Sequence, residues 1–184
     1  MTKYILHGGY ADRESVENYD FYKEILKDCS SPTNVLLVLF SRPDEMREEL
    51  GARLVSLFER NSEDISLSFE IAKESNFLAQ VKRADVVYLR GGDTLKLLNT
   101  LKVYNDLKNN FLGKVIAGES AGAYVLSNCF YSKTIGGVMS GLGHVPVNTI
   151  CHFEDKNADK LSECSQDSET LLLPNYKFKV FEGF

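Results

Sequence analysis

The sequence lacks the features that mark membrane-spanning, secreted and nucleic-acid-binding proteins. No apolar run approaches the ~20 residues that cross a bilayer, and the apolar part of residues 1–9 is too short for a secretory signal. The net charge is -5, and no run of Lys and Arg is long enough to follow a phosphate backbone. Neither a G-x-x-x-x-G-K-[ST] nor a G-x-G-x-x-G motif occurs, which disfavours a nucleotide-binding module. We therefore expect a cytoplasmic protein that binds neither membranes nor nucleic acid.

Cysteine is also scarce, and its spacing excludes two common kinds of stabilising site. The four cysteines lie far apart and form no C-x-x-C pair: Cys29, Cys129, Cys151 and Cys164. In a chain of 184 residues this argues against a disulfide framework and against a zinc site. We expect reduced, mostly buried thiols.

What is present is typical of one globular α/β domain over residues 1–184, since the chain is 43% hydrophobic and 26% charged and contains no linker or internal repeat. Short apolar runs predict strands over residues 4–7, 34–40, 65–69, 85–89, 114–117, 148–152, 170–173 and 178–181. Apolar residues at three- and four-residue spacings predict helices over residues 14–27, 44–58, 71–81, 94–109 and 155–164. This alternation predicts a mostly parallel sheet with helices on both faces. Residues 131–143 show no period and are expected to form an irregular loop.

The best nucleophile candidate is Ser120, in the centre of Gly-Glu-Ser-Ala-Gly at residues 118–122. An apolar run precedes this motif and a helix-like run over residues 121–126 follows it. In a strand, sharp turn, helix arrangement, small residues on either side let the backbone pass through a strained turn that exposes the hydroxyl. The five-residue pattern is common by chance, so this context carries the interpretation.

Ligands of an open parallel sheet bind where loops leave the carboxyl ends of the strands. The segments expected at this edge are His7-Gly8-Gly9, Ser41-Arg42, residues 90–94, Glu119-Ser120-Ala121 and the surroundings of His152. A serine peptidase needs a base on its nucleophile and amides aimed at the developing oxyanion. These segments could supply both.

Several motifs in this order carry a family resemblance. They are residues 88–98 (YLRGGDTLKLL), 117–123 (AGESAGA) and 141–146 (GLGHVP), followed by Cys151-His152-Phe153. Together they resemble the peptidase E and cyanophycinase family of serine peptidases. The resemblance implies a flavodoxin-like three-layer sandwich, related to class I glutamine amidotransferases, with serine in place of their elbow cysteine.

By position, the resemblance implies that Ser120 is the nucleophile and His152 the general base. It also implies that the amide of Gly91, or that of Gly92, joins the amide of Ala121 in the oxyanion hole. Such a mechanism needs neither metal nor organic cofactor. The family resemblance further implies a small peptide substrate, with an aspartyl dipeptide as one candidate.

The third, acidic residue of the triad is not evident. The best-known family members take it from the segment between the nucleophile and the histidine, yet residues 121–151 contain neither Asp nor Glu. Four acids lie further along the chain, Glu154, Asp155, Asp159 and Glu169, although a residue two or three positions from His152 often cannot reach back to its Nδ1. An incomplete triad would lower activity by about 10⁴.

Other residues compete for functional roles or have ordinary structural explanations. His7 and His144 are alternative bases, and His152 itself could be a hydrogen-bonded core histidine. Arg42 and Arg90 end strands at the expected edge and could bind a substrate carboxylate through their planar guanidinium groups, although surface ion pairs are more common. Glu119, next to the nucleophile, could hold a substrate amine or merely fill the variable position of the elbow.

The leading hypothesis is a serine-type peptidase that hydrolyses small peptides through an acyl-enzyme on Ser120. One alternative is an esterase on the same scaffold. Another is a noncatalytic or weakly active amidotransferase-like binding protein with an incomplete triad. A homodimer is possible because homodimers are common among soluble proteins, but no sequence feature marks an interface.

Overall fold

The computed structural model describes residues 1–63, 65–156, 158–165 and 167–183. Six strands form the main sheet in the order β10-β1-β5-β4-β2-β3. Their bounds, in chain order, are Lys3–His7 (β1), Thr33–Val38 (β2), Leu67–Ile71 (β3), Val86–Leu89 (β4), Val115–Glu119 (β5) and Phe178–Glu182 (β10). The edge strand β10 is antiparallel to β1, whereas all other neighbours are parallel. This arrangement confirms the expected α/β class.

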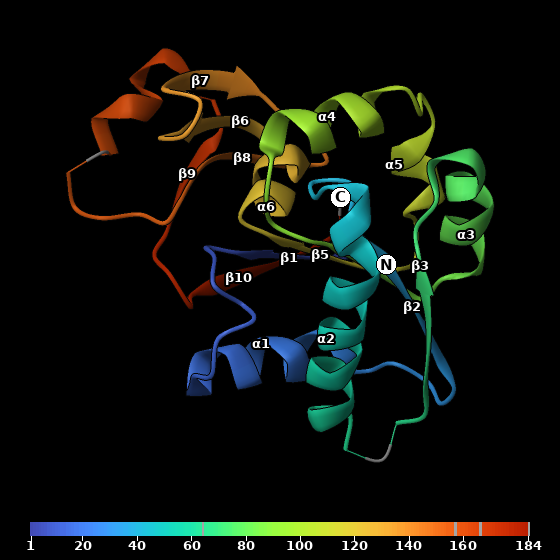
Figure 1. Cartoon of the computed structure of the whole chain (residues 1–184). Coiled ribbons are helices and arrows are strands. Elements are labelled where there is room, and N and C mark those ends of the chain that lie inside the picture. The colour runs from blue at the N-terminus through green and yellow to red at the C-terminus, as the bar shows by residue number, and fades with distance from the viewer. Residues whose placement is uncertain (64, 157, 166, 184) are drawn as a thin grey trace.

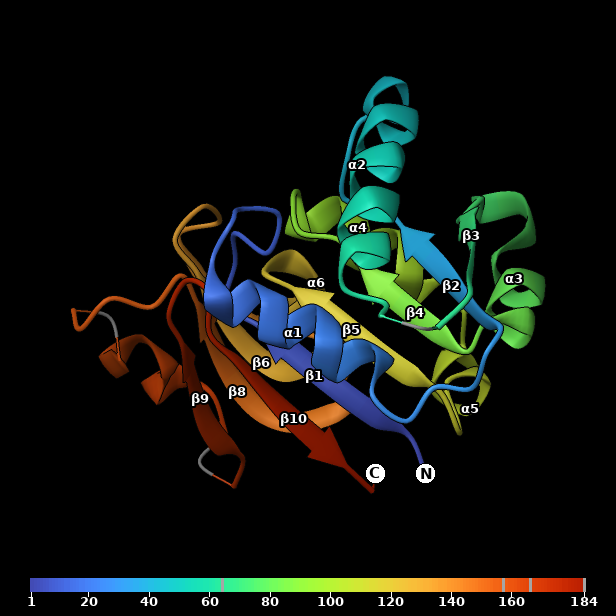
Figure 2. The same cartoon turned by 90° about the horizontal axis from the view of Figure 1, so that it is seen from below.

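Helices cover both faces of the main sheet (Figures 1 and 2). One face packs against α1 (Val16–Leu26) and α2 (Arg47–Arg60), and the other against α3 (Phe77–Arg83), α4 (Thr94–Lys102), α5 (Leu107–Asn110) and α6 (Ala121–Leu126). Strand β2 shows why, because Val35 and Leu37 belong to the α1 and α2 core while Leu36 and Val38 belong to the opposite core. A strand buried on both faces needs a continuous apolar run.

Several expected helices are shorter than the sequence pattern indicated. Residues 94–109 form α4 and α5 with a turn between them, and residues 44–46 and 74–76 form the 3-10 helices η1 (Asp44–Met46) and η2 (Glu74–Asn76) that lead into α2 and α3. The expected helix over residues 155–164, of which residue 157 lies outside the described residues, is wrong. A 3-10 helix, η3 (Ala158–Glu163), occupies part of it.

A second sheet, absent from our sequence prediction, has the order β7-β6-β8-β9. Its strands are Ser127–Ser132 (β6), Gly137–Ser140 (β7), Val145–Cys151 (β8) and Glu169–Leu173 (β9). The expected loop over residues 131–143 is therefore wrong, because it contains the antiparallel β6–β7 hairpin. Strand β7 is short and half-exposed, so no apolar period marks it. Helix α6 packs against both β5 and β8 and so joins the two sheets.

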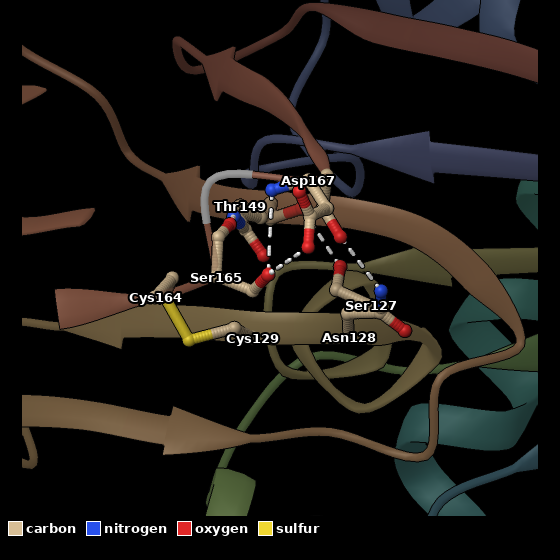
Figure 3. The surroundings of a disulfide bond; sticks show 9 residues. Ser127, Asn128, Cys129, Thr149, Cys164, Ser165 and Asp167 are labelled. Atoms are coloured by element: carbon tan, nitrogen blue, oxygen red, sulfur yellow. Dashed lines mark hydrogen bonds between the residues drawn. A yellow bond between two sulfur atoms is a disulfide. The ribbon is translucent and has the colours of Figure 1, made fainter. Parts of the chain in front are cut away.

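The expectation of four reduced cysteines is also wrong, because Cys129 and Cys164 form a disulfide with their Cα atoms 6.0 Å apart (Figure 3). It joins β6 to the residue after η3, across 35 positions of sequence. Spacing alone could not reveal this pair, since only the fold brings the two residues together. Cys29 and Cys151 are free. Disulfides are rare in cytosolic proteins, so this pair does not favour the expected cytoplasmic location. Within the described residues, no helix is long and apolar enough to cross a membrane.

Candidate active site

Ser120 lies in a sharp turn between β5 and α6, at the carboxyl edge of the main sheet. Its backbone has φ 49° and ψ -102°, a conformation rarely adopted by residues other than glycine. The turn is fixed by the Ser120 N–H, which donates to the His7 carbonyl at 2.9 Å. The flanking glycines permit close packing: a Cβ on Gly118 would lie 2.6 Å from the Gly122 carbonyl carbon, and one on Gly122 would lie 2.2 Å from the Leu89 oxygen. The sequence motif therefore corresponds to a strained elbow.

His152 reaches Ser120 from the second sheet, one residue after β8 ends. Its Nε2 lies 2.9 Å from the Ser120 Oγ, within hydrogen-bond distance. The backbone N–H of His152 donates to the Gly8 carbonyl at 2.9 Å. Tyr124 of α6 holds the end of β8, since its hydroxyl donates to the Cys151 carbonyl at 3.2 Å and accepts from the Cys151 N–H at 3.1 Å. Nucleophile and histidine thus come from different sheets that α6 ties together.

The other ring nitrogen of His152 contacts an amide rather than an acid. Its Nδ1 lies 2.6 Å from the Oδ1 of Asn175, in the segment between β9 and β10. Within the described residues, none of the four acids considered from the sequence contacts His152. Glu154 instead pairs with Lys133, Asp159 with Lys160 and Glu169 with Lys179. The third position beside His152 is therefore held by an amide, and not by one of the four acids that sequence position allowed.

Asn175 follows a predicted strand, but its place beside His152 depends on a strand pairing that only the structure shows. Strands β8 and β9 are parallel neighbours, and Cys151 pairs with Leu173, so the residues that follow the two strands meet at one edge. His152 follows the first strand and Asn175 the second. Our search for the third residue considered acids alone and so passed over an amide at the same edge.

The glycine loop after β1 packs directly against the His152 ring. Gly9 has φ 128°, and a Cβ built on it would lie 2.0 Å from the His152 Cε1. The same loop binds the Asn175 segment, because the Gly8 N–H donates to the Lys177 carbonyl at 2.8 Å and the Tyr176 N–H donates to the Gly9 carbonyl at 3.1 Å. One backbone loop therefore positions both the imidazole and its amide partner.

Backbone strain concentrates around this pair. Among the described residues, six that are not glycine have positive φ, and four of them lie at this site: Tyr10 (62°), Ser120 (49°), His152 (51°) and Tyr176 (68°). The Tyr10 ring meets the His152 ring edge-on, with centroids 5.2 Å apart. Strained residues of this kind persist where the surrounding structure holds them, and they cluster at functional sites.

The two competing histidines are placed elsewhere. His7 is buried, its Nδ1 accepts from the Gly9 N–H at 3.0 Å and its Nε2 lies 2.9 Å from the Asn18 Oδ1. Burial is the main cause that lowers the pKa of His7 to about 4, so the ring is neutral at pH 7. His144 packs against Tyr4 and Phe111 near the start of β1, away from the carboxyl edge, and burial likewise lowers its pKa to about 4.

Arg90 and Glu119 form a buried ion pair behind the elbow. The Arg90 Nη2 also pairs with the Asp12 carboxylate at 2.9 Å, and the second Glu119 oxygen accepts from the Ala11 N–H at 3.1 Å. Their side chains are only 5% and 4% exposed, so the two charges neutralise each other in the interior and neither faces an open surface. The Gly91 N–H, expected in the oxyanion hole, is directed at the Glu119 carboxylate at 3.4 Å.

Arg42 is half-buried beside the glycine turn. Its Nε donates to the Gly91 carbonyl at 2.7 Å, and the Ser41 hydroxyl reaches the same oxygen at 3.1 Å. Desolvation, and then the neighbouring Arg90, lower the pKa of Arg42. A Cβ on Gly91 would lie 3.2 Å from the Ser120 Cβ, so this turn passes directly beside the nucleophile. Nowhere in the described residues do three or more His, Cys, Asp or Glu side chains gather as a metal site would require.

The chain is similar to known proteins in sequence family and in fold. The family model for peptidase family S51 matches residues 46–171. The chain belongs to peptidase family S51. The match confirms the resemblance seen in the sequence motifs and supports peptidase function.

Solved structures with the same fold include a peptidase and a putative peptidase E protein. A peptidase from an acI-B1 Actinobacterium superposes with a TM-score of 0.68 at 21% identity, over 99% of this chain and 84% of the other. A putative peptidase E protein from Listeria monocytogenes EGD-e gives a TM-score of 0.65 at 18% identity, over 100% of this chain and 95% of the other. No curated protein matches the sequence significantly.

Proposed function

We propose that this member of peptidase family S51 is a serine-type peptidase that hydrolyses small peptides through an acyl-enzyme on Ser120. The observation that carries the proposal is the 2.9 Å contact between the Ser120 Oγ and the His152 Nε2, on an elbow whose strained backbone exposes the hydroxyl. An activated nucleophile needs a base within about 2.6–3.2 Å that a further group orients. His152 meets the distance criterion, and its other nitrogen is held at 2.6 Å.

In the proposed mechanism, Ser120 Oγ attacks the scissile carbonyl while His152 Nε2 accepts its proton. The tetrahedral intermediate then collapses as the imidazolium donates that proton to the leaving amine. Water attacks the acyl-enzyme with His152 again acting as base, which releases the acid product and restores the serine. The chain's own side chains supply every proton transfer in this scheme.

The oxyanion would accept hydrogen bonds from two backbone amides. Ala121, the first residue of α6, supplies one, because the first N–H groups of a helix have no partner within it. For the second we propose Gly92 in place of Gly91, whose N–H faces Glu119. Ser41 and Arg42 hold the Gly91 carbonyl. The Gly92 N–H belongs to the same trans peptide group as the Gly91 carbonyl and points in the opposite direction to it. The Gly92 N–H is therefore fixed and directed away from Ser41 and Arg42.

Substrate specificity would rest on Arg42 rather than on Arg90 or Glu119. Arg90 and Glu119 neutralise each other in the interior, whereas Arg42 is half-buried beside the glycine turn and uses its Nε to hold the Gly91 carbonyl. Its guanidinium could take a substrate carboxylate through its terminal nitrogens. An aspartyl dipeptide, with a side-chain carboxylate near the scissile bond, fits this site.

Active-site labelling with a fluorophosphonate tests the proposal. Wild-type protein should be labelled, Ser120→Ala should not, and His152→Ala should react far more slowly. Ser56→Ala, which changes an exposed serine of α2, is the matched control and should label normally. A panel of aspartyl, glutamyl and neutral dipeptides, with a simple ester, then tests substrate class, and Arg42→Ala should raise KM for acidic dipeptides. Unlabelled wild type beside a labelled serine hydrolase would refute the serine mechanism.

A further inference from the structure

We infer that Asn175 is the third member of this site, a neutral residue that positions His152 and selects its reactive tautomer. The inference rests on the proposed function, because it concerns how the base of that reaction is oriented. It arises from the 2.6 Å contact between the Asn175 Oδ1 and the His152 Nδ1. Asn175 touches neither nucleophile nor oxyanion in this contact and acts through the histidine alone.

The donor and acceptor rules fix the tautomer. A carboxamide oxygen can only accept, so the hydrogen between Asn175 Oδ1 and His152 must belong to Nδ1. A neutral imidazole carries one N–H, which leaves the Nε2 lone pair facing the Ser120 Oγ at 2.9 Å. This is the tautomer that can accept the serine proton. Asparagine can therefore perform the orienting task, as it does in cysteine peptidases that use a His-Asn pair.

His7 provides an internal contrast in the same molecule. Its Nδ1 accepts the Gly9 N–H at 3.0 Å, so its own hydrogen must lie on Nε2, which faces the Asn18 Oδ1 at 2.9 Å. Two histidines on opposite sides of Gly9 thus hold opposite tautomers, each set by an asparagine oxygen. A spectroscopic measurement on one sample can compare them directly.

The surrounding backbone makes Asn175 a rigid partner. It follows β9, where Leu173 pairs with Cys151, so the strand that carries His152 is in register with the strand that leads to Asn175. A Cβ on Gly8 would lie 2.0 Å from the Pro174 oxygen, which shows how closely the loops pack. An orienting hydrogen bond has value only when both groups are held in place, and here the same loop holds both.

A neutral partner cannot supply the negative charge that an acid would give to the imidazolium. Within the described residues, charged or titratable groups surround this part of the site. They are His7, Tyr10 with Arg13 over its ring, Tyr176 beside Tyr10, Tyr124 bonded to Cys151, Cys151 itself, and Glu119 with its partner Arg90. Burial raises the pKa of the Cys151 thiol, and Glu119 is committed to Arg90. A carboxylate at position 175 would therefore be the nearest anion to the ring and would favour its protonated form.

The experiment compares Asn175→Ala, Asn175→Asp and the surface control Asn99→Ala. Two readouts are used: the imidazole tautomers from 15N NMR, with His152 assigned by its loss in His152→Gln, and the fluorophosphonate labelling rate from pH 5 to 9. Asn175→Ala should lose the single Nδ1–H tautomer of His152 and label roughly 10- to 100-fold more slowly. Asn175→Asp should recover the labelling that Asn175→Ala loses. The fall in its labelling rate on the acid side of the pH profile should lie at higher pH than in the wild type. Asn99→Ala should match wild type in both readouts.

Results of two kinds, one in the tautomer and one in the rate, would overturn the inference. One is an Nε2–H tautomer for His152 in the wild type, or a tautomer unchanged in Asn175→Ala. The other is a rate increase of about 10⁴ in Asn175→Asp, which would show that the asparagine holds the wrong tautomer, as it does when it replaces the acid of a serine protease. Failure of the proposed function gives a different result from failure of this inference. The wild type would then resist labelling, while the NMR measurement would still decide whether Asn175 sets the His152 tautomer.

Discussion

Replacing Gly9 with alanine should disable the site while leaving the fold in place. A Cβ at this position would lie 2.0 Å from the His152 Cε1, with the Nδ1 and Nε2 atoms at 2.6 and 2.7 Å. The contact is with the ring itself, so no flexible side-chain end can move aside. Because the Gly8 carbonyl accepts the His152 N–H, the backbone of the histidine cannot retreat freely either. The imidazole must shift relative to Ser120.

The magnitude follows from the geometry. Ordinary van der Waals contact begins at 3.4 Å, so relief of the overlap requires a displacement of 3.4 - 2.0 = 1.4 Å, shared between the ring and the loop. Misplacement of a catalytic group by about 1 Å can lower a rate by about 10²-fold. The positive φ of Gly9, 128°, adds a stability cost of about 1–3 kcal/mol that is independent of the ring. We therefore expect a loss of about 10² in labelling rate and a modest loss of stability.

Gly136→Ala separates these two effects. Gly136 also has a positive φ, 77°, but no described heavy atom lies within 4 Å of a Cβ built on it. Urea unfolding should show a stability loss in both variants, about 1–2 kcal/mol for Gly136→Ala and more for Gly9→Ala, in which the overlap with the His152 ring adds to the cost. Fluorophosphonate labelling at a temperature where both are folded should fall in Gly9→Ala alone. Labelling of Gly9→Ala at the wild-type rate would refute the argument that this loop sets the position of His152.

Three further predictions concern stability. Glu119→Gln should lower the free energy of unfolding by about 1.5–3 kcal/mol in urea unfolding, because the buried Arg90 guanidinium then keeps only Asp12 as a counter-charge. His144→Leu should flatten the pH dependence of stability between pH 6.5 and 4. Burial lowers the pKa of His144 from 6.5 to about 4, so its contribution is complete above pH 6.5, falls with pH until about 4, and amounts to about 3 kcal/mol. Reduction of the Cys129–Cys164 disulfide, which closes a loop of 35 residues, should cost about 4 kcal/mol, measured as a fall in Tm with reductant.

Each of these predictions has a matched control. The exposed Arg83–Glu70 pair is the comparison for the buried one, and Glu70→Gln should cost less than about 1 kcal/mol. If both glutamine variants cost the same, the argument from burial is wrong. A pH profile of His144→Leu parallel to that of the wild type would assign the titration to other groups. A Cys164→Ser variant should be insensitive to reductant, and an equal response from it would exclude the disulfide as the cause.

The sequence revealed the part of the site formed by neighbouring residues in the chain, but not the part that the tertiary fold brings together. Ser120 could be found because a strand, a glycine-flanked serine and a helix are contiguous in the chain. His152 followed from the family order of motifs. The roles of Arg90 and Glu119 could not be read in the same way, since both end strands at the expected edge and only burial shows that they pair with each other.

Two segments were wrongly predicted from the sequence. Strand β7 is half-exposed and lies in a glycine-rich hairpin, so neither a two-residue nor a helical period marks it. The apolar spacing over residues 155–164 predicted a longer helix, but the structure has only the 3-10 helix η3, which buries one residue, Leu161. The Cys129–Cys164 disulfide depends on both misassigned segments, β6 with its hairpin and η3, being folded against each other. The wrong prediction of these two segments therefore led to the wrong prediction that all four cysteines are reduced.

In the second sheet, the disulfide that stabilises the fold and the contacts that align His152 lie on different faces. Along β8, Cys151 and Val147 face α6 and the main core, whereas Ile150 faces the outer cluster with Cys129, Leu161 and Cys164. The disulfide therefore lies on the face of the second sheet opposite α6. The contacts that align His152, namely Tyr124 to Cys151 and the His152 N–H to the Gly8 carbonyl, lie on the inner side. It follows that reductant should lower the melting temperature without changing the labelling rate of the folded protein. A parallel loss of both would mean that the outer cluster transmits its packing through β8 to the imidazole.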